Sequence, residues 1–326
     1  MIYTITLNPA LDRYIEVEDL VVDDANRITS ERLYAGGKGI DVSRAIQHLG
    51  GETMALGFNG GHSGEQLLAL LKQEGVTTYF TAIAGETRQN VLINPRRRRR
   101  QTMLNAAGPV VSTQEWKAFL THLKLLDLRG AFVVASGSLP QGVPADAYAQ
   151  IVHLGRARGA KVIVDADGPA LRAAIKAKPF AIKPNVNELR RLVGRVLNDE
   201  GELLRAAAAL NRDGIDVVLV SRGPEGVLLV SRNEWYRAVP PEVAVKSTVG
   251  AGDSTVAGFV LKYAAGRALD ECVRYATACG TAATLAPGNQ LCQARDVQRL
   301  APNVRVTALG PKPQRAPKAR RRQGDR

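Results

Sequence analysis

The residues with the clearest chemical potential are six consecutive positions, Thr248–Asp253, which read Thr-Val-Gly-Ala-Gly-Asp. The two glycines allow a tight turn with unblocked amide N–H groups, and an apolar pattern with helical spacing follows from Val256 to Tyr263. A helix N-terminus after such a turn binds oxyanions and phosphates. Asp253 would lie in the first helical turn, where its carboxylate could take a proton from an attacking hydroxyl. The segment is therefore typical of phosphoryl transfer, and the alternative is an ordinary glycine-rich helix start with an acidic cap.

A second glycine cluster, Gly36-Gly37-Lys38-Gly39, precedes another helical pattern that begins at Ile40. Its glycines permit close approach of a ligand, and the helix start again favours an anion. The spacing fits neither a Walker A loop nor a dinucleotide-binding fingerprint. Gly61-His62-Ser63-Gly64 lacks the spacing of a hydrolase nucleophile elbow, and the four histidines have no metal-ligand spacing. Hydrolase and zinc-enzyme chemistry therefore have little support.

Strand-like and helix-like segments alternate along most of the chain. The expected strands are Ile2–Leu7, Met54–Phe58, Ala131–Ala135, Lys161–Asp165, Phe180–Lys183 and Val217–Ser221. The expected helices lie near Ile40–Leu49, Gly64–Glu74, Gln114–Leu125, Ala145–Arg158 and Glu200–Asn211. This alternation predicts an α/β fold, with a mainly parallel sheet between two layers of helices.

Polar and glycine-rich clusters follow each of the six expected strands. They are Asn8-Pro9 with Asp12, Asn59-Gly60-Gly61, Ser136-Gly137-Ser138, Asp165–Gly168, Lys183-Pro184-Asn185 and Ser221-Arg222-Gly223. Ligands of open α/β sheets bind beyond the carboxyl ends of the strands. Six such clusters at one edge predict a ligand site there, although any single polar loop is weak evidence.

Two segments, near residues 13–34 and 88–105, interrupt the alternation and read as extended chain. We expect them to pair into a small sheet that is separate from the main one and forms a lid over a cleft. The run Arg96–Arg100 would occupy a hairpin tip of this lid, since exposed tips tolerate charge. Because the open face of a small sheet needs a cover, we also expect a homodimer that forms through the lid.

The composition bounds the class of protein. A chain of 326 residues with 45% apolar residues can hold one large α/β domain or two ordinary ones. Neither a membrane-spanning stretch nor a signal-peptide layout is visible. Cys272, Cys279 and Cys292 lack C-x-x-C spacing, which favours a reduced, cytoplasmic setting. Cys272 and Cys279, about two helical turns apart, are predicted to be core residues.

The net charge of +13 is concentrated in two short blocks. Arg96–Arg100 contributes +5, and residues 311–326, with seven Lys or Arg and one Asp, contribute +6, which leaves the rest of the chain nearly neutral. Such blocks are usually solvated, and 311–326 also contains three prolines, so it is predicted to be a disordered basic tail. A nucleic-acid-binding protein that uses these two blocks is the remote alternative function.

Taken together, the motifs resemble the PfkB family of sugar kinases, which has the ribokinase-like fold. The resemblance covers about residues 1–300 and rests on Ala35–Gly39 and Ser247–Ser254, each at the expected place in the βα order. Further matches are Thr6–Asp12, Thr87–Asn90, Ser136–Pro140 and Lys183–Glu188. They resemble the phosphosugar branch, which contains the minor 6-phosphofructokinase, 1-phosphofructokinase and tagatose-6-phosphate kinase. Thr87–Asn90 and Thr281–Cys292 are most similar to the first of these, and we expect one kinase domain over residues 1–310.

The resemblance implies ATP-dependent phosphorylation of a phosphosugar, with fructose 6-phosphate as the first expected acceptor and fructose 1-phosphate or tagatose 6-phosphate as alternatives. Asp253 would be the general base, and the amides of Gly250, Ala251 and Gly252 would form the anion hole. On the sugar side, Asp12 would hold hydroxyls and Asp41 would face the sugar. Arg27 and Arg88 would bind the phosphate of the sugar. The residues Gly36, Gly37 and Lys38 would lie by that phosphate, and Ser138 would line the pocket.

The resemblance also implies ATP, Mg²⁺ and a monovalent cation such as K⁺ as cofactors. Lys183, Asn185, Glu188, Ser221 and Gly223 fall where the family binds ATP phosphates and magnesium, with Glu188 reaching the metal through water. Ser247 and Thr248 would adjoin the nucleotide. Ser247, Val249, Ala283 and Gly288 match a monovalent-cation loop, in which Ala286 and Gln290 replace the polar or basic residues expected there.

Several other interpretations stay open from the sequence. Arg27 could be an ordinary surface residue of the lid, and Lys183 with Glu188 could be a local ion pair. Asp41 stands where the family usually has Asn, and a carboxylate near a phosphosugar is unfavourable unless Lys38 or an arginine neutralises it. The arginine run also departs from the family, whose tip is a short mixed turn. A degenerate kinase fold that serves as a scaffold is a third class of function, against which the intact Asp253 and its glycines argue.

Overall fold

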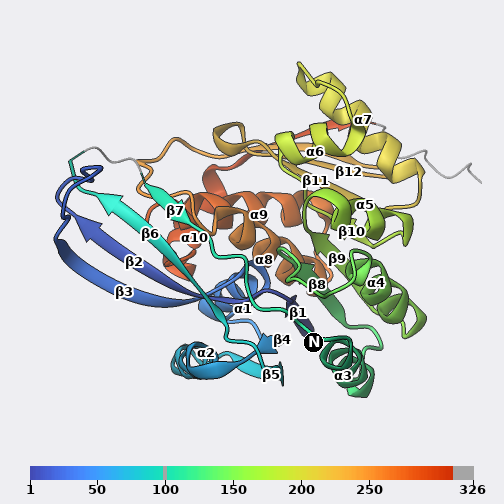
Figure 1. Ribbon diagram of the computed structural model, residues 1–326. Helices are drawn as coiled ribbons and strands as arrows, with labels where there is room; N and C mark the ends of the chain where they lie inside the picture. The colour runs from blue at the N-terminus through green and yellow to red at the C-terminus, as the bar shows by residue number, and fades with distance from the viewer. Residues whose placement is uncertain (98–100, 311–326) are drawn as a thin grey trace, which may run out of the picture.

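The computed structural model describes residues 1–97 and 101–310, which form a large sheet, a small sheet and the helices around them (Figure 1). The large sheet has ten strands in the order β14-β13-β12-β11-β10-β9-β8-β1-β4-β5. In chain order these are β1 (Ile2–Thr6), β4 (Thr53–Asn59), β5 (Thr77–Ala82), β8 (Phe132–Ser136), β9 (Lys161–Asp165), β10 (Ala181–Ile182), β11 (Val217–Ser221), β12 (Val227–Ser231), β13 (Trp235–Val239) and β14 (Arg305–Gly310). The strands from β5 to β11 are parallel, and β12, β13 and β14 extend the sheet as antiparallel strands.

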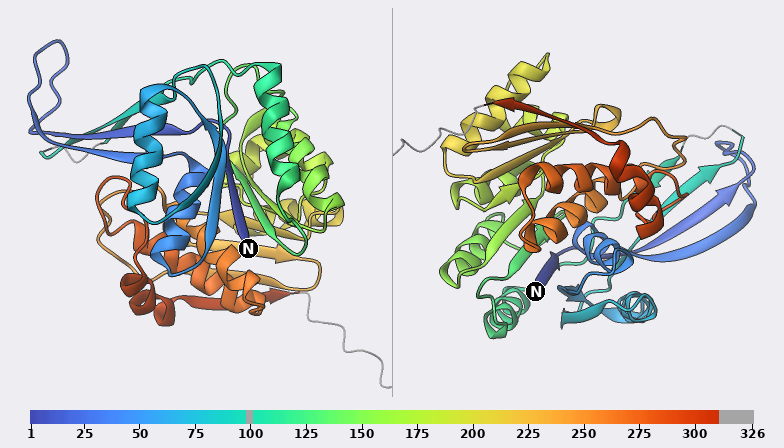
Figure 2. Two further views of the ribbon diagram at one scale, coloured as in Figure 1. Left: turned by 90° about the horizontal axis from the view of Figure 1, so that it is seen from below. Right: turned by 180° about the vertical axis from the view of Figure 1, so that it is seen from behind.

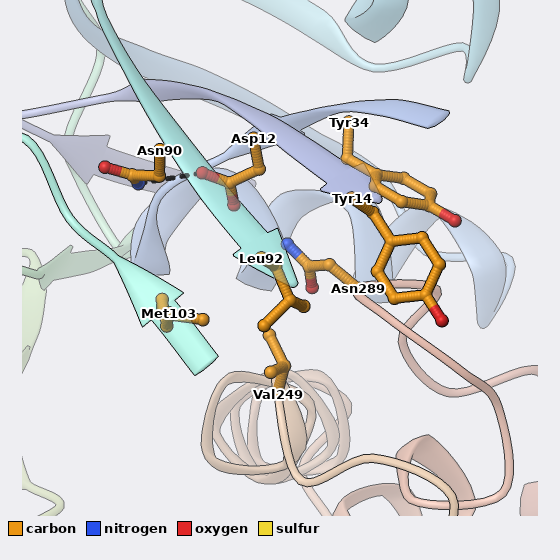
Figure 3. Close-up of a pocket in the computed structure, with 8 residues that line it drawn as sticks. All are labelled: Asp12, Tyr14, Tyr34, Asn90, Leu92, Met103, Val249 and Asn289. Carbon is orange, nitrogen blue, oxygen red and sulfur yellow. Dashed lines mark hydrogen bonds between the residues drawn. The ribbon is translucent and has the colours of Figure 1, made fainter. Parts of the chain in front are cut away.

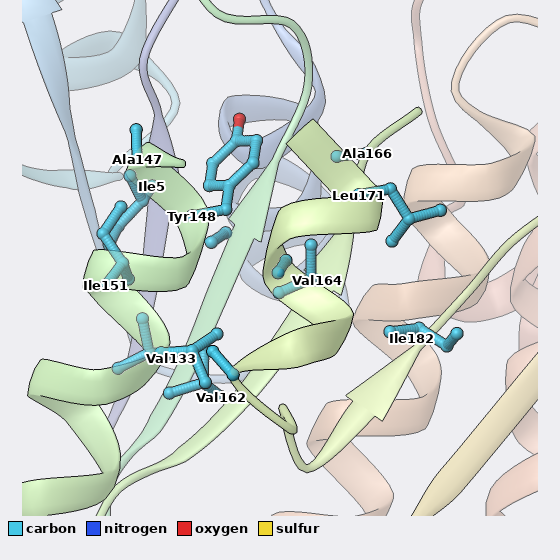
Figure 4. Close-up of a cluster of buried hydrophobic side chains, with 14 of the residues drawn as sticks. Ile5, Val133, Ala147, Tyr148, Ile151, Val162, Val164, Ala166, Leu171 and Ile182 are labelled. Carbon is cyan, nitrogen blue, oxygen red and sulfur yellow. The ribbon is translucent and has the colours of Figure 1, made fainter. Parts of the chain in front are cut away.

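Helices cover both faces of this sheet because its strand residues alternate between two apolar clusters. In β8, Val133 and Ala135 pack in one cluster and Phe132 and Val134 in the other. The first cluster includes residues of α3 (Thr113–Leu125), α4 (Ala147–Ala157), α5 (Gly168–Lys176), α6 (Val186–Val193) and α7 (Glu200–Arg212). The second includes residues of α1 (Lys38–His48), α8 (Ala251–Ala264), α9 (Leu269–Ala283) and α10 (Ala294–Leu300). Figure 4 shows how Tyr148 and Ile151 of α4 lie over Val133 and Val162 of the sheet.

A third cluster joins α2 (Gly61–Gln73) to the edge of the large sheet. Leu67 and Leu71 of α2 are fully buried against Ala55 of β4 and Ile40 of α1. The same cluster contains Ala35, which lies at the end of a lid strand. The base of the lid is therefore anchored in the core of the α/β body.

The small sheet forms the lid, with strand order β3-β2-β6-β7. Its strands are β2 (Ala10–Val17), β3 (Ile28–Gly36), β6 (Arg88–Pro95) and β7 (Thr102–Leu104). Ala10 pairs with both Gly36 and Arg88, so the first residues of β2 and β6 and the last of β3 lie together at the base. Figure 2 shows that the other end of the lid projects away from the body.

These elements confirm the predicted α/β fold with a separate lid sheet. Lys161–Asp165 and Val217–Ser221 are strands with the predicted bounds, and the segments near 13–34 and 88–105 do pair with each other. The predicted strand Phe180–Lys183 is shorter, Ala181–Ile182, because the chain turns at Lys183 and Pro184 into α6. The three cysteines are free and buried, which confirms the prediction that Cys272 and Cys279 are core residues. Among the described residues, no helix combines the length and apolar character that a membrane crossing would need.

The two basic blocks are only partly within the described residues. Arg96 and Arg97 lie after β6 and pair with Glu16 and Glu18 at 2.9 and 3.1 Å. Arg98–Arg100, which complete the predicted hairpin tip, and the predicted tail 311–326 lie outside them.

Candidate active site

Asp253 lies in the first turn of α8, beside the turn that the sequence singled out. Gly250 is the N-cap of this helix and has a left-handed backbone with φ of 74°. Among residues 1–97 and 101–310 no side chain caps the helix, so its first amide N–H groups are open to an anion. Asp253 is 8% exposed. The local sequence therefore builds an anion site with a buried carboxylate one turn away.

Two lysines and one carboxylate surround this turn. The carboxylate of Asp165, at the end of β9, receives Lys38 Nζ at 3.2 Å and Lys183 Nζ at 3.3 Å. Lys183 Nζ also lies 3.4 Å from the point that a Cβ on Gly252 would occupy. Although burial opposes ionisation, the two lysines hold the pKa of Asp165 below its usual value. Because two cations share one anion, the group has a net positive charge that faces the anion site.

The electrostatic surroundings of Asp253 favour a role as a proton acceptor. Its pKa is raised to about 6, chiefly by burial and in part by Asp165, while Lys38 and Lys183 oppose the shift. A carboxylate with a pKa near 6 is largely ionised at neutral pH and is a stronger base than an exposed aspartate. Asp253 thus has the position and the protonation state that a general base for a hydroxyl needs.

The second glycine cluster lies beside Asp12 at the base of the lid. A Cβ on Gly36 would collide with the Asp12 carboxylate, and one on Gly37 would lie 2.6 Å from Thr6 Cγ2, so both positions require glycine. Asn90 Nδ2 of β6 donates to Asp12 Oδ1 at 2.8 Å. Burial raises the pKa of Asp12, and the bond from Asn90 opposes this. The structure therefore brings the predicted sugar-binding residues Asp12, Gly36 and Gly37 together.

Asp41 forms an ion pair with an arginine. The sequence analysis required such a cation if a carboxylate is to lie near a phosphosugar. Arg44, only 2% exposed, donates from Nη1 to Asp41 Oδ1 at 3.1 Å and from Nε to Glu74 Oε2 at 2.8 Å. Asn289 Nδ2 donates to the same oxygen of Asp41 at 3.0 Å. Burial nevertheless holds the pKa of Asp41 well above its usual value, with Arg44 opposing and Asp253 adding to the shift.

Arg88 of β6 and Ser138 lie on either side of Asn8, after the end of β1. Arg88 donates to the carbonyl oxygens of Ala106 at 2.7 Å and Asn8 at 2.9 Å, and its buried Nε has no partner among the described residues. Asn8 Nδ2 donates to Ser138 Oγ at 3.2 Å. The Arg88 guanidinium is thus held at the base of the lid, where two of its five N–H groups donate to backbone carbonyls of the described residues and the others can meet an anion.

A small cavity of about 10 Å³ lies between the lid and the body, which is room for about one water molecule. Figure 3 shows Asp12, Tyr14, Asn90 and Leu92 of the lid facing Val249 and Asn289 of the body. Ser247 Oγ donates to Gln101 Oε1 of the lid at 3.3 Å. The lid is therefore closed on the body, and this cavity must widen if it is to admit part of a sugar.

The residues that the sequence analysis predicted to bind ATP fall into two groups in the structure. Ser221, Gly223, Thr248, Ala251 and Gly252 line a cavity of about 610 Å³ on the other side of the α8 turn. The remaining walls are mostly apolar but include one carboxylate and several threonines: Pro224, Gly226, Val227, Pro240, Pro241, Glu242, Val243, Val245, Thr255, Thr277, Gly280, Thr281 and Thr284. A cavity of this size and lining suits a nucleoside.

The other group, Lys183, Asn185 and Glu188, lies at the start of α6. Asn185 and Glu188 form a reciprocal cap, in which Glu188 Oε2 accepts from Asn185 N at 2.7 Å. Lys183 pairs with Asp165 and not with Glu188, so the alternative of a Lys183–Glu188 ion pair is wrong. The Glu188 carboxylate acts electrostatically on both Lys38 and Asp253, which places it near the same site.

The proposed cation loop lies next to the small cavity. Ser247 Oγ accepts from Val249 N at 3.2 Å, and Gly288, with φ of 62°, packs on the ring of Tyr14. Ala283 ends α9. Apart from Ser247, these positions would offer backbone carbonyl oxygens as ligands for a monovalent cation. Among the described residues, no cluster of three or more His, Cys, Asp or Glu side chains could hold a metal ion by itself.

Arg27 is the predicted site residue that the structure does not bring to Asp253. It is exposed and precedes β3, whose other end carries Gly36. Gly36 lies nine positions after Arg27, and at 3.3 Å per residue this is about 30 Å. Within one chain Arg27 therefore lies at the far end of the lid.

Sequence reasoning missed four residues that the structure places in the site. Asp165 stood out only as one of the polar residues at strand ends, and it links Lys38 to Lys183. Arg44 follows Asp41 by three positions, a helical spacing that signals an ion pair. Asn90 and Asn289 carried no sequence signal of this kind, because their partners Asp12 and Asp41 are remote in the chain.

This arrangement matches a known family. Residues 6–296 match the model of the pfkB family of carbohydrate kinases. The chain belongs to this family. It is 37% identical to 1-phosphofructokinase of Bacillus subtilis strain 168 over 309 residues, which cover 95% of this chain and 100% of that protein. Three further curated relatives, 34–38% identical, also have the name 1-phosphofructokinase.

Other pfkB relatives have a different name. The ATP-dependent 6-phosphofructokinase isozyme 2 of Escherichia coli K12 is 36% identical over 301 residues, with 92% of this chain and 97% of that protein covered. The structure of Escherichia coli phosphofructokinase-2 with substrates and products has a TM-score of 0.90 at 36% identity, and covers 93% of this chain and 98% of that one. As a member of this family, the protein is a carbohydrate kinase, an ATP-dependent phosphotransferase with the ribokinase-like fold.

Proposed function

We propose that this pfkB kinase transfers the terminal phosphoryl group of ATP to the free primary hydroxyl of a fructose monophosphate and forms fructose 1,6-bisphosphate. The observation that carries the proposal is the position of Asp253, buried in the first turn of an uncapped helix and beside the Lys38–Asp165–Lys183 group. A base, an anion hole and fixed positive charge are the parts that phosphoryl transfer needs.

In this mechanism, the sugar hydroxyl oxygen forms the new bond to phosphorus as the bond to the leaving ADP oxygen breaks. The hydroxyl proton passes to Asp253. The amides of Gly250, Ala251 and Gly252 and the Lys183 ammonium stabilise the charge on the transferring group. General-base assistance of this kind typically contributes about 10²–10⁴-fold.

The residues present fit the expected cofactors. Mg²⁺ usually binds through one or two carboxylates, waters and substrate phosphates, and Glu188, in its helix cap, can supply such a carboxylate contact through water. When bound, the metal would neutralise charge on the ATP phosphates. The carbonyls of Val249, Ala283 and Gly288 suit K⁺, and a structure of Escherichia coli phosphofructokinase-2 contains potassium.

Two acceptors are candidates. Fructose 1-phosphate is favoured by the names of the relatives, since four curated proteins of 34–38% identity are 1-phosphofructokinases. Fructose 6-phosphate is favoured by the 6-phosphofructokinase isozyme of Escherichia coli and its closely similar structure. In both cases Arg88 would bind the phosphate that the substrate already has.

The lid supports the proposal of a homodimer. Ile28, Met103 and Leu104 on its strands are 51%, 44% and 55% exposed, and a second copy of the lid would cover them. In such a dimer, Arg27 could bind a phosphosugar only in the site of the other subunit. A tetrameric form has been described for Escherichia coli phosphofructokinase-2.

The test is ADP release with fructose 1-phosphate, fructose 6-phosphate, tagatose 6-phosphate, fructose and ribose, measured with Mg²⁺ and with or without K⁺. We expect turnover with a fructose monophosphate and very little with the unphosphorylated sugars. Faster turnover of fructose or ribose would contradict the role of Arg88. Salt-sensitive nucleic-acid binding without any kinase turnover would favour the remote alternative instead.

A further inference from the structure

The amide of Asn289 is held between two carboxylates, and this fixes its orientation. Its Nδ2 donates to Asp41 Oδ1 at 3.0 Å, and it approaches Asp12 closely enough to lower the pKa of that group. Asp41 Oδ1 also accepts from Arg44, so this oxygen acts only as an acceptor. The nitrogen of the amide must therefore face Asp41 and Asp12, and its oxygen must face away from them.

That oxygen has no hydrogen-bond partner within the described part of the chain. Asn289 is 2% exposed, and its Oδ1 lies 3.0 Å from the point that a Cβ on Gly250 would occupy. Figure 3 shows the amide nitrogen on the side of Asp12 and the oxygen on the side of Val249, which precedes the anion-hole turn. A buried carbonyl oxygen without a donor costs about 1–3 kcal/mol, so a ligand hydroxyl would be a favourable partner.

We propose that Asn289 is a substrate-binding residue whose Oδ1 accepts a hydrogen bond from the sugar hydroxyl next to the reacting carbon. This rests on the proposed function, because it places the acceptor carbon of a fructose monophosphate at the Gly250–Asp253 turn. Oδ1 lies against that turn, whereas Arg88, assigned to the existing phosphate, lies at the base of the lid.

The two candidate substrates differ at this hydroxyl. In the furanose form of fructose 6-phosphate, the reacting carbon 1 is bonded to carbon 2, which has the anomeric hydroxyl. Fructose 1-phosphate would react at carbon 6, whose neighbour, carbon 5, has only a hydrogen besides the ring bonds. Asn289 therefore selects fructose 6-phosphate over fructose 1-phosphate.

The experiment compares fructose 6-phosphate, fructose 1-phosphate and the monophosphate of 2,5-anhydro-D-mannitol. This analogue has the furanose ring without the anomeric hydroxyl, and because the two ends of the unphosphorylated parent are equivalent, a single monophosphate stands in for both fructose monophosphates. We expect wild type to prefer fructose 6-phosphate. Asn289→Ala should lower kcat/KM for fructose 6-phosphate by roughly tenfold, the equivalent of one lost hydrogen bond, and lower that for the analogue less than twofold. The KM for ATP should not change.

Two further variants keep the test decisive. In Asp41→Asn, the amide of Asn289 loses the carboxylate that fixes its orientation. It can then turn its Oδ1 toward the new amide nitrogen and away from the sugar, so we expect a selective loss with fructose 6-phosphate even if Asn289→Ala folds poorly. Asn303→Ala, which removes an exposed amide bonded to the Arg299 carbonyl, should leave all three rates unchanged. Wild-type binding of each sugar, measured by calorimetry, gives the same preference without any variant.

Equal losses with fructose 6-phosphate and the analogue would overturn the assignment, because Asn289 would then not contact the anomeric hydroxyl. A wild-type preference for fructose 1-phosphate would overturn it as well. Both results would leave the proposed function intact. If wild type phosphorylates no fructose monophosphate, the proposed function and this assignment fail together.

Discussion

Replacing the proposed catalytic base, Asp253→Asn, should stabilise the fold while it abolishes most of the activity. The pKa of Asp253 is raised from 3.8 to about 6, so keeping this buried carboxylate ionised at pH 8 costs about two pKa units. At 1.36 kcal/mol per unit this is roughly 3 kcal/mol. An amide of the same shape avoids that cost. For about 300 ordered residues, an unfolding entropy of ~2.1 cal/mol/K per residue converts it into a rise of roughly 5 °C in Tm.

The gain in stability from Asp253→Asn must depend on pH in a definite direction. Because the folded-state pKa lies above the unfolded one, protonated Asp253 is favourable to folding below pH 3.8, and this advantage is lost as the pH rises through about 6. The difference in Tm between Asp253→Asn and wild type should therefore be largest at pH 7–8. At pH 5 it should be about half as large, since only about one pKa unit then separates the pH from the unfolded-state pKa.

The assay is thermal unfolding of both proteins in matched buffers from pH 5 to pH 8, without nucleotide or sugar. Asp216→Asn, at an exposed position between α7 and β11, is the control and should show no pH-dependent change in Tm. In the same preparations kcat should fall by about 10²–10⁴. A Tm at pH 8 that is equal to or below that of wild type would refute the reasoning, because the carboxylate would then be stabilised by its surroundings and unsuited to take up a proton.

Three other outcomes follow from the same geometry. The kcat/KM for the phosphosugar should rise with pH and reach half its plateau near pH 6, the pKa of Asp253. Because Lys38 lowers that pKa, Lys38→Met should move the midpoint to a higher pH. An unshifted midpoint would contradict the coupling between Lys38 and Asp253. Arg88→Ala should raise the KM for the phosphosugar at least tenfold in steady-state assays, with the KM for ATP unchanged as the internal control. Gly250→Ala should abolish activity and lower Tm more than Gly266→Ala. The backbone φ is nearly the same at both positions, 74° and 72°, but only at Gly250 would a Cβ meet other side chains. Equal losses of Tm would show that backbone strain alone matters at Gly250.

Much of the body was predictable because its signals are local. The six predicted strands are short apolar runs that end in polar clusters, and all six belong to the parallel part of the large sheet, so their carboxyl ends lie at one edge. The catalytic turn combines Gly250, Gly252 and Asp253 within four positions, so its geometry is encoded by adjacent residues. The pairing of the lid segments also followed from their extended pattern.

Five of the elements that the sequence analysis did not predict, β5, α6, β12, β13 and β14, have weak local patterns. β12, β13 and β14 extend the sheet by antiparallel pairing, and β14 comes from a segment about 65 residues after β13. β5 is an edge strand whose residues are mostly half-exposed. α6 spans only eight residues and is defined by the reciprocal cap of Asn185 and Glu188. In each case the local pattern is short, and tertiary pairing decides the structure.

The same distinction separates the reaction from its specificity. The base, the anion hole and Lys38 lie in two compact motifs, which is why the class of reaction could be predicted from the chain alone. The choice between two fructose monophosphates depends on side chains that meet only after folding: Asp12 from the lid, Asp41 from α1 and Asn289 from the loop after α9. Asp41 alone would repel a phosphosugar, whereas Asp41 paired with Arg44 becomes a fixed acceptor that orients a neutral amide. An acidic residue at this position is therefore compatible with a phosphosugar kinase, provided that Arg44 and Asn289 are both present.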